Sequence, residues 1–245
     1  MAQAVVTGAT SGIGQAIALA LHAAGHQVIA LGRDPDALAQ LGARGLTPLA
    51  LDLGQSGDLS ARLGTALSGL APDILVNNAG MVAPPGNFCD MAEADIHRSL
   101  ATNLTQALLV THAIAPGMRA RGRGHIFFTG SIAGHTPYPN MAVYAATKAA
   151  LGGFAQSLRL DLSASGVRVT EIVAGRVESP LYKDVLSPEA RAAMYAGNTA
   201  VQPEDVAAMV LAVLALPPHV DVARFDILPT RQPVTPQVPS EQVKK

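Results

Sequence analysis

Short, continuous apolar runs alternate with helical stretches along almost the whole chain, and this alternation restricts the fold more than any other feature. The runs are "AVVT" (4–7), "QVIAL" (27–31), "PLALDL" (48–53), "DILVNN" (73–78), "HIFFTG" (125–130), "RVTEIV" (168–173) and "ARFDIL" (223–228). Strands that are apolar throughout are typical of a parallel sheet covered on both faces. Because such strands are joined by right-handed helical crossovers, the sequence predicts an α/β fold with a doubly wound parallel β-sheet.

The helices expected between these strands cover residues 13–24, 34–42, 59–69, 96–121, 142–163 and 203–216. Gly25 closes the first of them, since glycine best tolerates the left-handed conformation that ends a helix. Neither an internal repeat nor a linker interrupts the pattern. We therefore expect one domain over residues 1–229, followed by an extended tail over 230–245 whose first part has the alternative of packing on the molecule or on a neighbouring subunit.

The composition excludes several classes of partner. With 49% hydrophobic and 14% charged residues, a chain of 245 residues has enough apolar material for one large core. A net charge of −1 gives no sign of binding to nucleic acid or to an anionic membrane. Cys89 is the single cysteine, no signal peptide is visible, and no apolar run reaches the roughly 20 residues that span a bilayer. We expect a cytoplasmic protein.

The stretch "TGATSGIG" (7–14) follows the first predicted strand and opens the first predicted helix. Gly8, Gly12 and Gly14 let the backbone turn tightly and approach a ligand closely, and the free N–H groups of the helix start favour a phosphate. The spacing is GxxxGxG rather than the GxGxxG fingerprint. The context of strand, glycines and helix nevertheless indicates a dinucleotide site.

The end of the second strand indicates which dinucleotide binds. An acidic residue about 20 positions after the glycines would hold the 2′-hydroxyl of NAD, but Gly32 stands there. Arg33 follows, and its guanidinium can pair with a 2′-phosphate. Asp34 and Asp36 leave open the alternative that Arg33 is neutralised. On balance the sequence favours NADP(H) over NAD(H).

"YAATK" places Tyr144 and Lys148 on one helix face, since residues at i and i+4 are neighbours there. A free tyrosine titrates near pH ~10, too high for a base at neutral pH. An ammonium one turn away and a positively charged nicotinamide would both lower that pKa. Tyr144 and Lys148 are therefore either exposed surface residues or a catalytic acid–base pair, and other motifs must distinguish these two interpretations.

Three further features decide it: "NNAG" (77–80), Asn103 in "ATNLTQA", and Ser131 after the fifth strand. With them, residues 3–230 resemble the short-chain dehydrogenase/reductase family, in its branch of roughly 250 residues. The resemblance implies a single Rossmann-like domain with no metal site. It implies that Tyr144 is the acid–base, that Ser131 binds the substrate oxygen, and that Lys148 supports both the tyrosine and the cofactor.

The residues implied by the resemblance form two sets. The catalytic set is Asn103, which would hold a water in the proton relay, with Ser131, Tyr144 and Lys148. The cofactor set is Gly8, Thr10, Ser11, Gly12, Ile13, Gly14, Arg33, Asp52, Leu53, Asn78, Ala79, Gly80, Tyr144, Lys148, Gly175, Val177 and Ser179. In "AGRVESP", Ala174 stands where the family usually has proline, and Ser179 stands where it has threonine.

The substrate would lie under a mobile lid formed by residues 176–200. The expected substrate residues are His135, Tyr138, Asn140, Arg176 and Tyr182. For His135 and Tyr138, packing of their own loop is the competing interpretation. Arg176 is the most suggestive, because a guanidinium beside the cofactor can grip a carboxylate or sulfonate.

The C-terminal quarter contains "GNTAVQPEDVAAMVLAVLALPPHVDV" (197–222) followed by "DILPTRQ" (226–232). It resembles a narrower subgroup that acts on 3-hydroxy acids, including serine dehydrogenases and sulfoacetaldehyde reductases. That resemblance implies an NADP(H)-dependent enzyme for a small polar, anionic oxo compound or alcohol, and a homotetramer or homodimer. Helices 96–121 and 142–163 would form the dimer contact. A reductase for neutral ketones or polyols, with NAD as its possible cofactor, and a non-enzymatic dinucleotide-binding regulator are the alternatives.

Overall fold

The computed structural model describes residues 1–54, 58–136, 138–197 and 199–231. Its centre is one seven-stranded sheet in which every pair of neighbouring strands is parallel. The strands are β1 (Gln3–Thr7), β2 (Gln27–Gly32), β3 (Thr47–Ala50), β4 (Ile74–Asn77), β5 (Gly124–Thr129), β6 (Val167–Ala174) and β7 (Arg224–Ile227). All seven predicted strands, and the parallel sheet, are confirmed.

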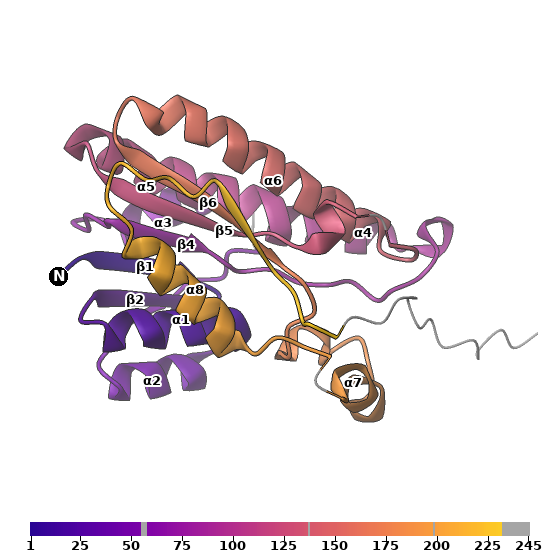
Figure 1. Cartoon of the computed structure of the whole chain (residues 1–245). Helices are drawn as coiled ribbons and strands as arrows, with labels where there is room; N and C mark the ends of the chain where they lie inside the picture. The colour runs from indigo at the N-terminus through magenta and orange to yellow at the C-terminus, as the bar shows by residue number, and fades with distance from the viewer. Residues whose placement is uncertain (55–57, 137, 198, 232–245) are drawn as a thin grey trace, which may run out of the picture.

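Helices cover both faces of the sheet (Figure 1). One face carries α1 (Gly12–Ala23), α2 (Pro35–Ala43) and α8 (Pro203–Leu214), and the other carries α3 (Leu59–Ala66), α5 (Gln106–Arg121) and α6 (Ala142–Ser163). Two hydrophobic clusters, one on each face, fill the space between sheet and helices. The predicted Rossmann-like, doubly wound fold is therefore confirmed.

The remaining helical segments lie in the connections. They are η1 (Phe88–Asp90), α4 (Glu93–Leu100), η2 (Ala101–Thr105), η3 (Ile132–Gly134), η4 (Pro180–Tyr182) and α7 (Pro188–Tyr195). Both η4 and α7 fall within the predicted lid. The predicted tail (230–245) lies outside the described residues from position 232 onward. Within the described ranges, no helix is long and apolar enough to cross a membrane.

Strand order β3-β2-β1-β4-β5-β6-β7 fixes where a ligand can enter. The chain leaves β3 at one edge and returns on the other side of β1 as β4, so the direction of winding reverses between β1 and β4. In open α/β sheets the crevice outside the carboxyl ends of the strands, at such a reversal, is where ligands bind. The glycine stretch 7–14 follows β1 at this position.

The prediction of one α-helix over 96–121 was wrong. The helical path begins at Glu93, and the π-helical segment η2 interrupts it before α5 starts. Asn103 lies within η2 and is 1% exposed. Its Oδ1 accepts from the Met81 N–H (2.7 Å) and its Nδ2 donates to the Met81 carbonyl (3.0 Å), which ties the segment to the end of β4. Single π-helical turns of this kind are frequent at functional sites.

Candidate active site

The glycine stretch packs directly against "NNAG". Gly8 and Gly12 have φ values of 65° and 53°, the left-handed region that only glycine enters freely. A Cβ on Gly8 would lie 2.8 Å from the Cα of Ala79, and one on Gly14 would overlap the carbonyl oxygen of Gly8. Side chains at these positions would push the loop away from the strand beside it.

Thr7 and Asn78 lock three strand ends together. The Thr7 hydroxyl accepts from the N–H groups of Asn78 (2.9 Å) and Ala79 (3.0 Å). Asn78 Nδ2 donates to the carbonyls of Thr7 (3.3 Å) and Gly8 (3.4 Å), and its Oδ1 accepts from the Thr129 hydroxyl (3.2 Å). Because these bonds join the ends of β1, β4 and β5, the floor of the crevice is rigid.

The start of α1 is suited to a phosphate. Ser11 occupies the N-cap position, yet its side chain makes no capping hydrogen bond, and the first turn contains no acidic residue. The first N–H groups of a helix have no partners within the helix. An anion placed here would receive those N–H groups and the positive end of the helix dipole. The residues at the start of α1 therefore fit the pyrophosphate of a dinucleotide. Thr10 and Ile13 flank Ser11 and Gly12 at this helix start.

At the end of β2 the structure separates Arg33 from its acidic neighbour. The Asp34 carboxylate caps α2, accepting from the N–H groups of Asp36 and Ala37 at 3.1 Å each. Arg33 is exposed and makes no ion pair within the described ranges. A Cβ on Gly32 would lie 2.5 Å from Cγ2 of Thr10, so an acidic side chain at the position that would select NAD requires Thr10 to move.

The predicted adenine contacts follow β3. Asp52 Oδ1 accepts from the Gly54 N–H (2.9 Å), and Arg62 donates to the Asp52 carbonyl (2.9 Å). Leu53 is 7% exposed and belongs to the hydrophobic cluster on the α3 side. These contacts fix the loop at the carboxyl edge of the sheet.

Ser131 and Tyr144 meet beyond the carboxyl end of β5. Ser131 follows β5, is 8% exposed, and caps η3 by accepting from the Ala133 N–H (3.2 Å). Tyr144 lies in the first turn of α6 and is half-buried. Burial raises the pKa of Tyr144, and a hydrogen bond with the Ser131 side chain lowers it. Because burial opposes ionisation here, the tyrosine needs a nearby positive charge to act as a base.

Lys148 is the nearest source of that charge. Its Nζ donates to the Thr129 carbonyl (2.7 Å) and lies 5.8 Å from the centre of the Tyr144 ring. The lysine is 5% exposed. Burial lowers its pKa to about 8, although the negative charge of Glu171 raises it. The structure thus brings together Ser131, Tyr144 and Lys148, as the sequence predicted.

Asn103 closes the site from the α5 side. Besides its two bonds to Met81, its Nδ2 donates to the Thr147 hydroxyl (3.3 Å), which donates to the Tyr144 carbonyl (2.7 Å). A Cβ on Gly80 would lie 3.3 Å from Asn103 Oδ1 and 3.8 Å from Lys148 Nζ, so this glycine keeps the space between them open. Thr147 had no predicted role, and only its place inside "YAATK" could have pointed to it.

The segment after β6 folds over the glycine stretch. A Cβ on Gly12 would lie 3.1 Å from the Cβ of Ser179. Val177 forms a parallel bridge with Val201, and the Gly175 N–H donates to the Ile227 carbonyl (2.9 Å). These contacts bring the predicted residues Gly175, Val177 and Ser179 to the same edge of the sheet as "TGATSGIG".

The five predicted substrate residues have different surroundings. Arg176 Nη1 donates to the Met194 carbonyl (3.0 Å), which links the end of β6 to α7. Burial raises the pKa of Tyr182, as do Tyr144 and Tyr195, while Arg176 lowers it. Arg176 and Tyr144 are therefore both close enough to Tyr182 to shift its pKa.

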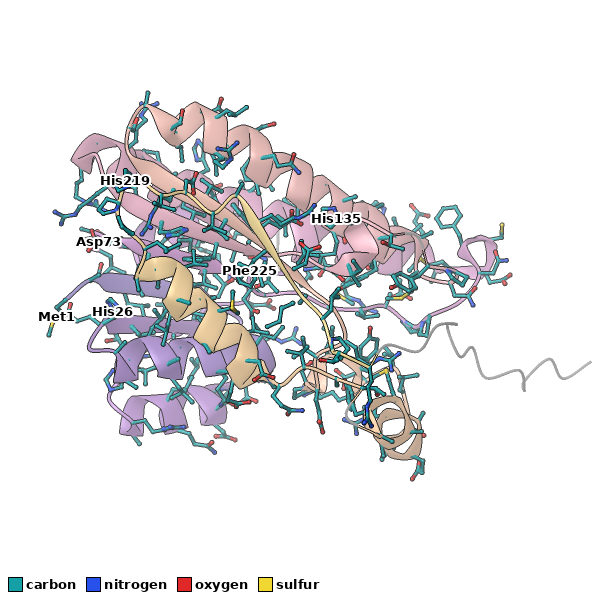
Figure 2. All side chains as sticks on the ribbon, viewed as in Figure 1. Met1, His26, Asp73, His135, His219 and Phe225 are labelled. Atoms are coloured by element: carbon teal, nitrogen blue, oxygen red, sulfur yellow. The ribbon has the colours of Figure 1, made fainter. Side chains whose placement is uncertain are left out.

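The other three lie in the loop between β5 and α6. Tyr138 is 36% exposed, and Asn140 has a φ of 63°, a left-handed conformation that asparagine tolerates better than most residues. His135 Nε2 lies 3.0 Å from Oε1 of Glu171, a buried acid that the sequence reasoning did not single out. Figure 2 places His135 beside the first turns of α6.

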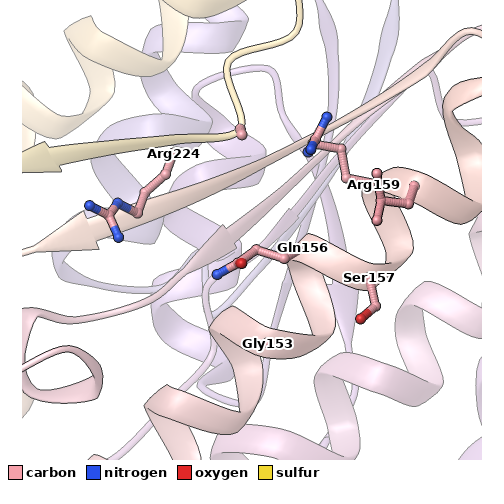
Figure 3. A pocket seen from close by; sticks show the side chains of 7 residues that line it. Gly153, Gln156, Ser157, Arg159 and Arg224 are labelled. Carbon is pink, nitrogen blue, oxygen red and sulfur yellow. The ribbon is translucent and has the colours of Figure 1, made fainter.

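A groove of about 450 Å³ lies elsewhere, along α6 and β7 (Figure 3). Its lining includes Gly153, Gln156, Arg159 and Arg224. Gly153 is roughly 13 Å of helix beyond Tyr144. The groove is therefore separate from the site where Ser131, Tyr144 and Lys148 meet.

Known proteins share both the sequence pattern and this fold. The model of the short chain dehydrogenases matches residues 2–190. An uncharacterised short-chain type dehydrogenase/reductase of Sinorhizobium fredii is 43% identical, over 94% of this chain and 92% of its own. A sulfoacetaldehyde reductase of Chromohalobacter salexigens is 37% identical, over 93% of each chain. The closed form of a serine dehydrogenase complexed with NADP⁺ has a TM-score of 0.89 at 33% identity, covering 95% of this chain and 97% of that one.

The lowered pKa of Lys148 predicts a pH-dependent cost to folding. Well above pH 10.5 the amine is neutral in both the folded and the unfolded protein, so no cost exists there. As the pH falls through about 8, the folded state must accept a buried charge. At pH 7 the cost reaches about 3 kcal/mol. Lys148→Met should therefore raise the free energy of unfolding at pH 7 by about 1–3 kcal/mol, and the gain should fall below about 1 kcal/mol near pH 10.

Urea unfolding of wild type and variant at the two pH values measures this difference. Lys183→Met removes an exposed lysine and should change the free energy of unfolding little at either pH. A gain for Lys148→Met that is equal at both pH values would contradict the assigned cause.

Proposed function

Because the chain belongs to the short-chain dehydrogenase/reductase family, we propose that it is an NADP(H)-dependent enzyme for a small anionic oxo compound and its alcohol. Its membership makes it an NAD(P)-dependent oxidoreductase acting on CH–OH groups. The finer proposal is a substrate of the 3-hydroxy acid or sulfoacetaldehyde type. The observation that carries the oxidoreductase chemistry is the meeting of Ser131, Tyr144 and buried Lys148 beyond the carboxyl end of β5, and the anionic substrate rests on Arg176.

The proposed chemistry assigns one task to each residue. A bound nicotinamide supplies or accepts the hydride. Ser131 donates a hydrogen bond to the substrate oxygen, where charge develops as the carbonyl becomes an alkoxide. Tyr144 gives its proton to that oxygen during reduction and takes it back during oxidation. Lys148 stabilises the phenolate and would bind the ribose of the cofactor, and Asn103 would hold a water that relays the proton.

Arg33 supports NADP(H) rather than NAD(H). Its guanidinium is exposed at the end of β2, and the neighbouring Asp34 carboxylate is engaged in capping α2. An acid at position 32, which would select NAD, requires Thr10 to move, because Thr10 lies against Gly32. A 2′-phosphate beside Arg33 would gain a charge-assisted hydrogen bond with no competing partner.

Arg176 supports an anionic substrate. It lies within electrostatic reach of Tyr182, which is itself within reach of Tyr144. One of its N–H groups is engaged by the Met194 carbonyl, and a guanidinium has four more. The sulfoacetaldehyde reductase and the serine dehydrogenase act on compounds with an acidic group close to the reacting carbon. In the proposed complex, Arg176 binds the acidic group of a small oxo acid or oxo sulfonate whose carbonyl faces Tyr144.

The Met194 contact also favours a second candidate. If Arg176 serves only to fasten α7 to the end of β6, the substrate needs no acidic group. The enzyme would then reduce neutral ketones or oxidise polyols. The two candidates share the same catalytic residues and differ in what the lid recognises.

We also propose a single catalytic domain over residues 1–229 with a lid over 176–200, a homotetramer or homodimer, and a cytoplasmic location. Leu160 on α6 supports self-association, because 65% of this large apolar side chain is exposed in the single chain. A second copy of α6 packed on it would remove that surface from water.

Loss of Arg33 should weaken NADPH selectively. Arg33→Ala should raise the KM for NADPH about 10–100-fold, since a charge-assisted hydrogen bond contributes about 1.5–3 kcal/mol. The KM for NADH should stay within about twofold. Arg44→Ala removes another exposed arginine, at the end of α2, and should change neither constant. Equal losses for both cofactors in Arg33→Ala would remove the case for NADP(H).

Loss of Arg176 should weaken anionic substrates selectively. The assay crosses NADPH and NADH with sulfoacetaldehyde and with propanal, a neutral aldehyde of similar size. Arg176→Ala should raise the KM for sulfoacetaldehyde about 10-fold or more and leave that for propanal within about twofold. Arg191→Ala tests whether a looser lid is the cause, because Arg191 lies on α7 of the same lid. If wild type prefers propanal, or Arg176→Ala affects both aldehydes alike, the neutral-substrate candidate replaces the anionic one.

A further inference from the structure

Glu171 is a buried acid near Lys148, the proposed catalytic lysine. The proposed mechanism assigns no role to this acid. Glu171 lies in β6 and is 1% exposed. Side chains alternate along a strand, so Glu171 points to the same side of the sheet as Val167 and Val169, which pack in the α5 and α6 cluster. A carboxylate in such a row is strongly disfavoured unless a partner compensates it.

Two glycines make room for this carboxylate. A Cβ on Gly130, directly after β5, would lie 2.5 Å from Glu171 Oε1. A Cβ on Gly152, in α6, would lie 2.9 Å from the same oxygen. The carboxylate therefore occupies a slot between the end of β5 and the middle of α6, and a side chain at either glycine would displace it.

The slot lies beside Lys148. Gly152 is one helical turn beyond Lys148, and the Lys148 ammonium donates to the carbonyl of Thr129, the residue before Gly130. The carboxylate and the ammonium thus lie between the same two elements. Oε1 of Glu171 is 3.0 Å from His135 Nε2, and Oε2 has no hydrogen-bond partner among the described residues.

We propose that Glu171 is a positioning residue, whose buried carboxylate keeps Lys148 in its ammonium form and, through His135, fastens the loop that carries Ser131. The inference rests on the proposed function, because Lys148 contributes to turnover as the partner of Tyr144. It also gives His135 a task other than substrate contact, since its Nε2 is directed to the acid.

The groups around Lys148 support this assignment. Burial lowers the pKa of Lys148, and Glu171 is the group that raises it. Tyr144 approaches from the same helix, Thr129 from β5 contributes a neutral carbonyl, and the neutral Asn103 side chain lies across Gly80. His135 contacts Glu171, the acid that faces the lysine, at 3.0 Å.

One further charge lies next to Glu171 in the sheet. Arg224 on β7 is its register partner, but the Arg224 guanidinium pairs with Asp226 at 2.9 Å. The positive charge of Arg224 is therefore balanced within its own strand. Within the described ranges, this leaves the Lys148 ammonium and the His135 ring as the groups that the Glu171 carboxylate faces.

The titration of Lys148 can be followed directly. The lysines of the chain are Lys148, Lys183, Lys244 and Lys245, so protein labelled with ¹³C at the lysine ε carbon gives few NMR signals. Lys148→Met assigns the signal of interest. In wild type its midpoint should lie near pH 8. Glu171→Gln should lower this midpoint by about one pH unit or more, as expected for the loss of a nearby opposite charge.

Activity and a matched variant complete the test. At alkaline pH, kcat/KM for NADPH-dependent reduction should fall as Lys148 loses its proton. In Glu171→Gln the pH at which kcat/KM falls should decrease by the same amount as the NMR midpoint of Lys148. Glu204→Gln neutralises an exposed acid on α8. It should change neither the NMR midpoint of Lys148 nor the pH at which kcat/KM falls. His135→Gln should keep the lysine midpoint within about half a pH unit of wild type, because the carboxylate remains.

The result that overturns the proposal is an unchanged Lys148 midpoint in a Glu171→Gln protein that unfolds at the wild-type temperature. If Glu171→Gln does not fold, Glu171→Met replaces it: this side chain has a similar length and no charge, so the Lys148 midpoint should fall by about one pH unit or more, and a wild-type midpoint would overturn the proposal. The titration needs no turnover. A shifted midpoint in a protein inactive on every probe would uphold the positioning role and reject the proposed function.

Discussion

The candidate site depends on the interactions that hold the buried ammonium of Lys148. A charge removed from water is costly, and the structure meets that cost with two oxygens, the Thr129 carbonyl at 2.7 Å and the nearby Glu171 carboxylate. The same contacts fasten α6 to the end of β5, which brings Tyr144 next to Ser131. The buried charge lowers the free energy of unfolding, but it places a positive charge beside the Tyr144 ring. Functional sites commonly hold such unfavourable groups at a cost in stability.

A rigid scaffold holds the partners of that charge. Thr7 and Asn78 join the ends of β1, β4 and β5, so the glycine stretch and the Thr129 carbonyl belong to one hydrogen-bonded unit. The glycine stretch and α6, which Lys148 joins to the Thr129 carbonyl, are therefore fixed relative to each other. Asn103 extends the unit to the π-helical turn, through its two bonds to Met81.

The sequence predicted the strands and their parallel arrangement, because continuous apolar runs report directly on buried strands. The family resemblance singled out Ser131, Tyr144 and Lys148, which the structure brings together. The sequence did not predict the break in helix 96–121, because the π-helical turn depends on a tertiary contact between Asn103 and Met81. Glu171 was hidden inside "RVTEIV", since Gly130, His135 and Gly152 meet it only in the folded chain. Whether Asp34 neutralises Arg33 also required the structure, which directs that carboxylate to the start of α2.

The central claim is that Tyr144, held between Ser131 and Lys148, moves the proton of the reaction. The most direct measurement compares NADPH binding by fluorescence with turnover of the aldehyde that wild type reduces fastest, in wild type and in Tyr144→Phe. The phenylalanine keeps the ring and removes the hydroxyl, so the dissociation constant should stay within about threefold while turnover falls about 1,000-fold or more. A Tyr144→Phe protein that retains a tenth of wild-type turnover would contradict the account.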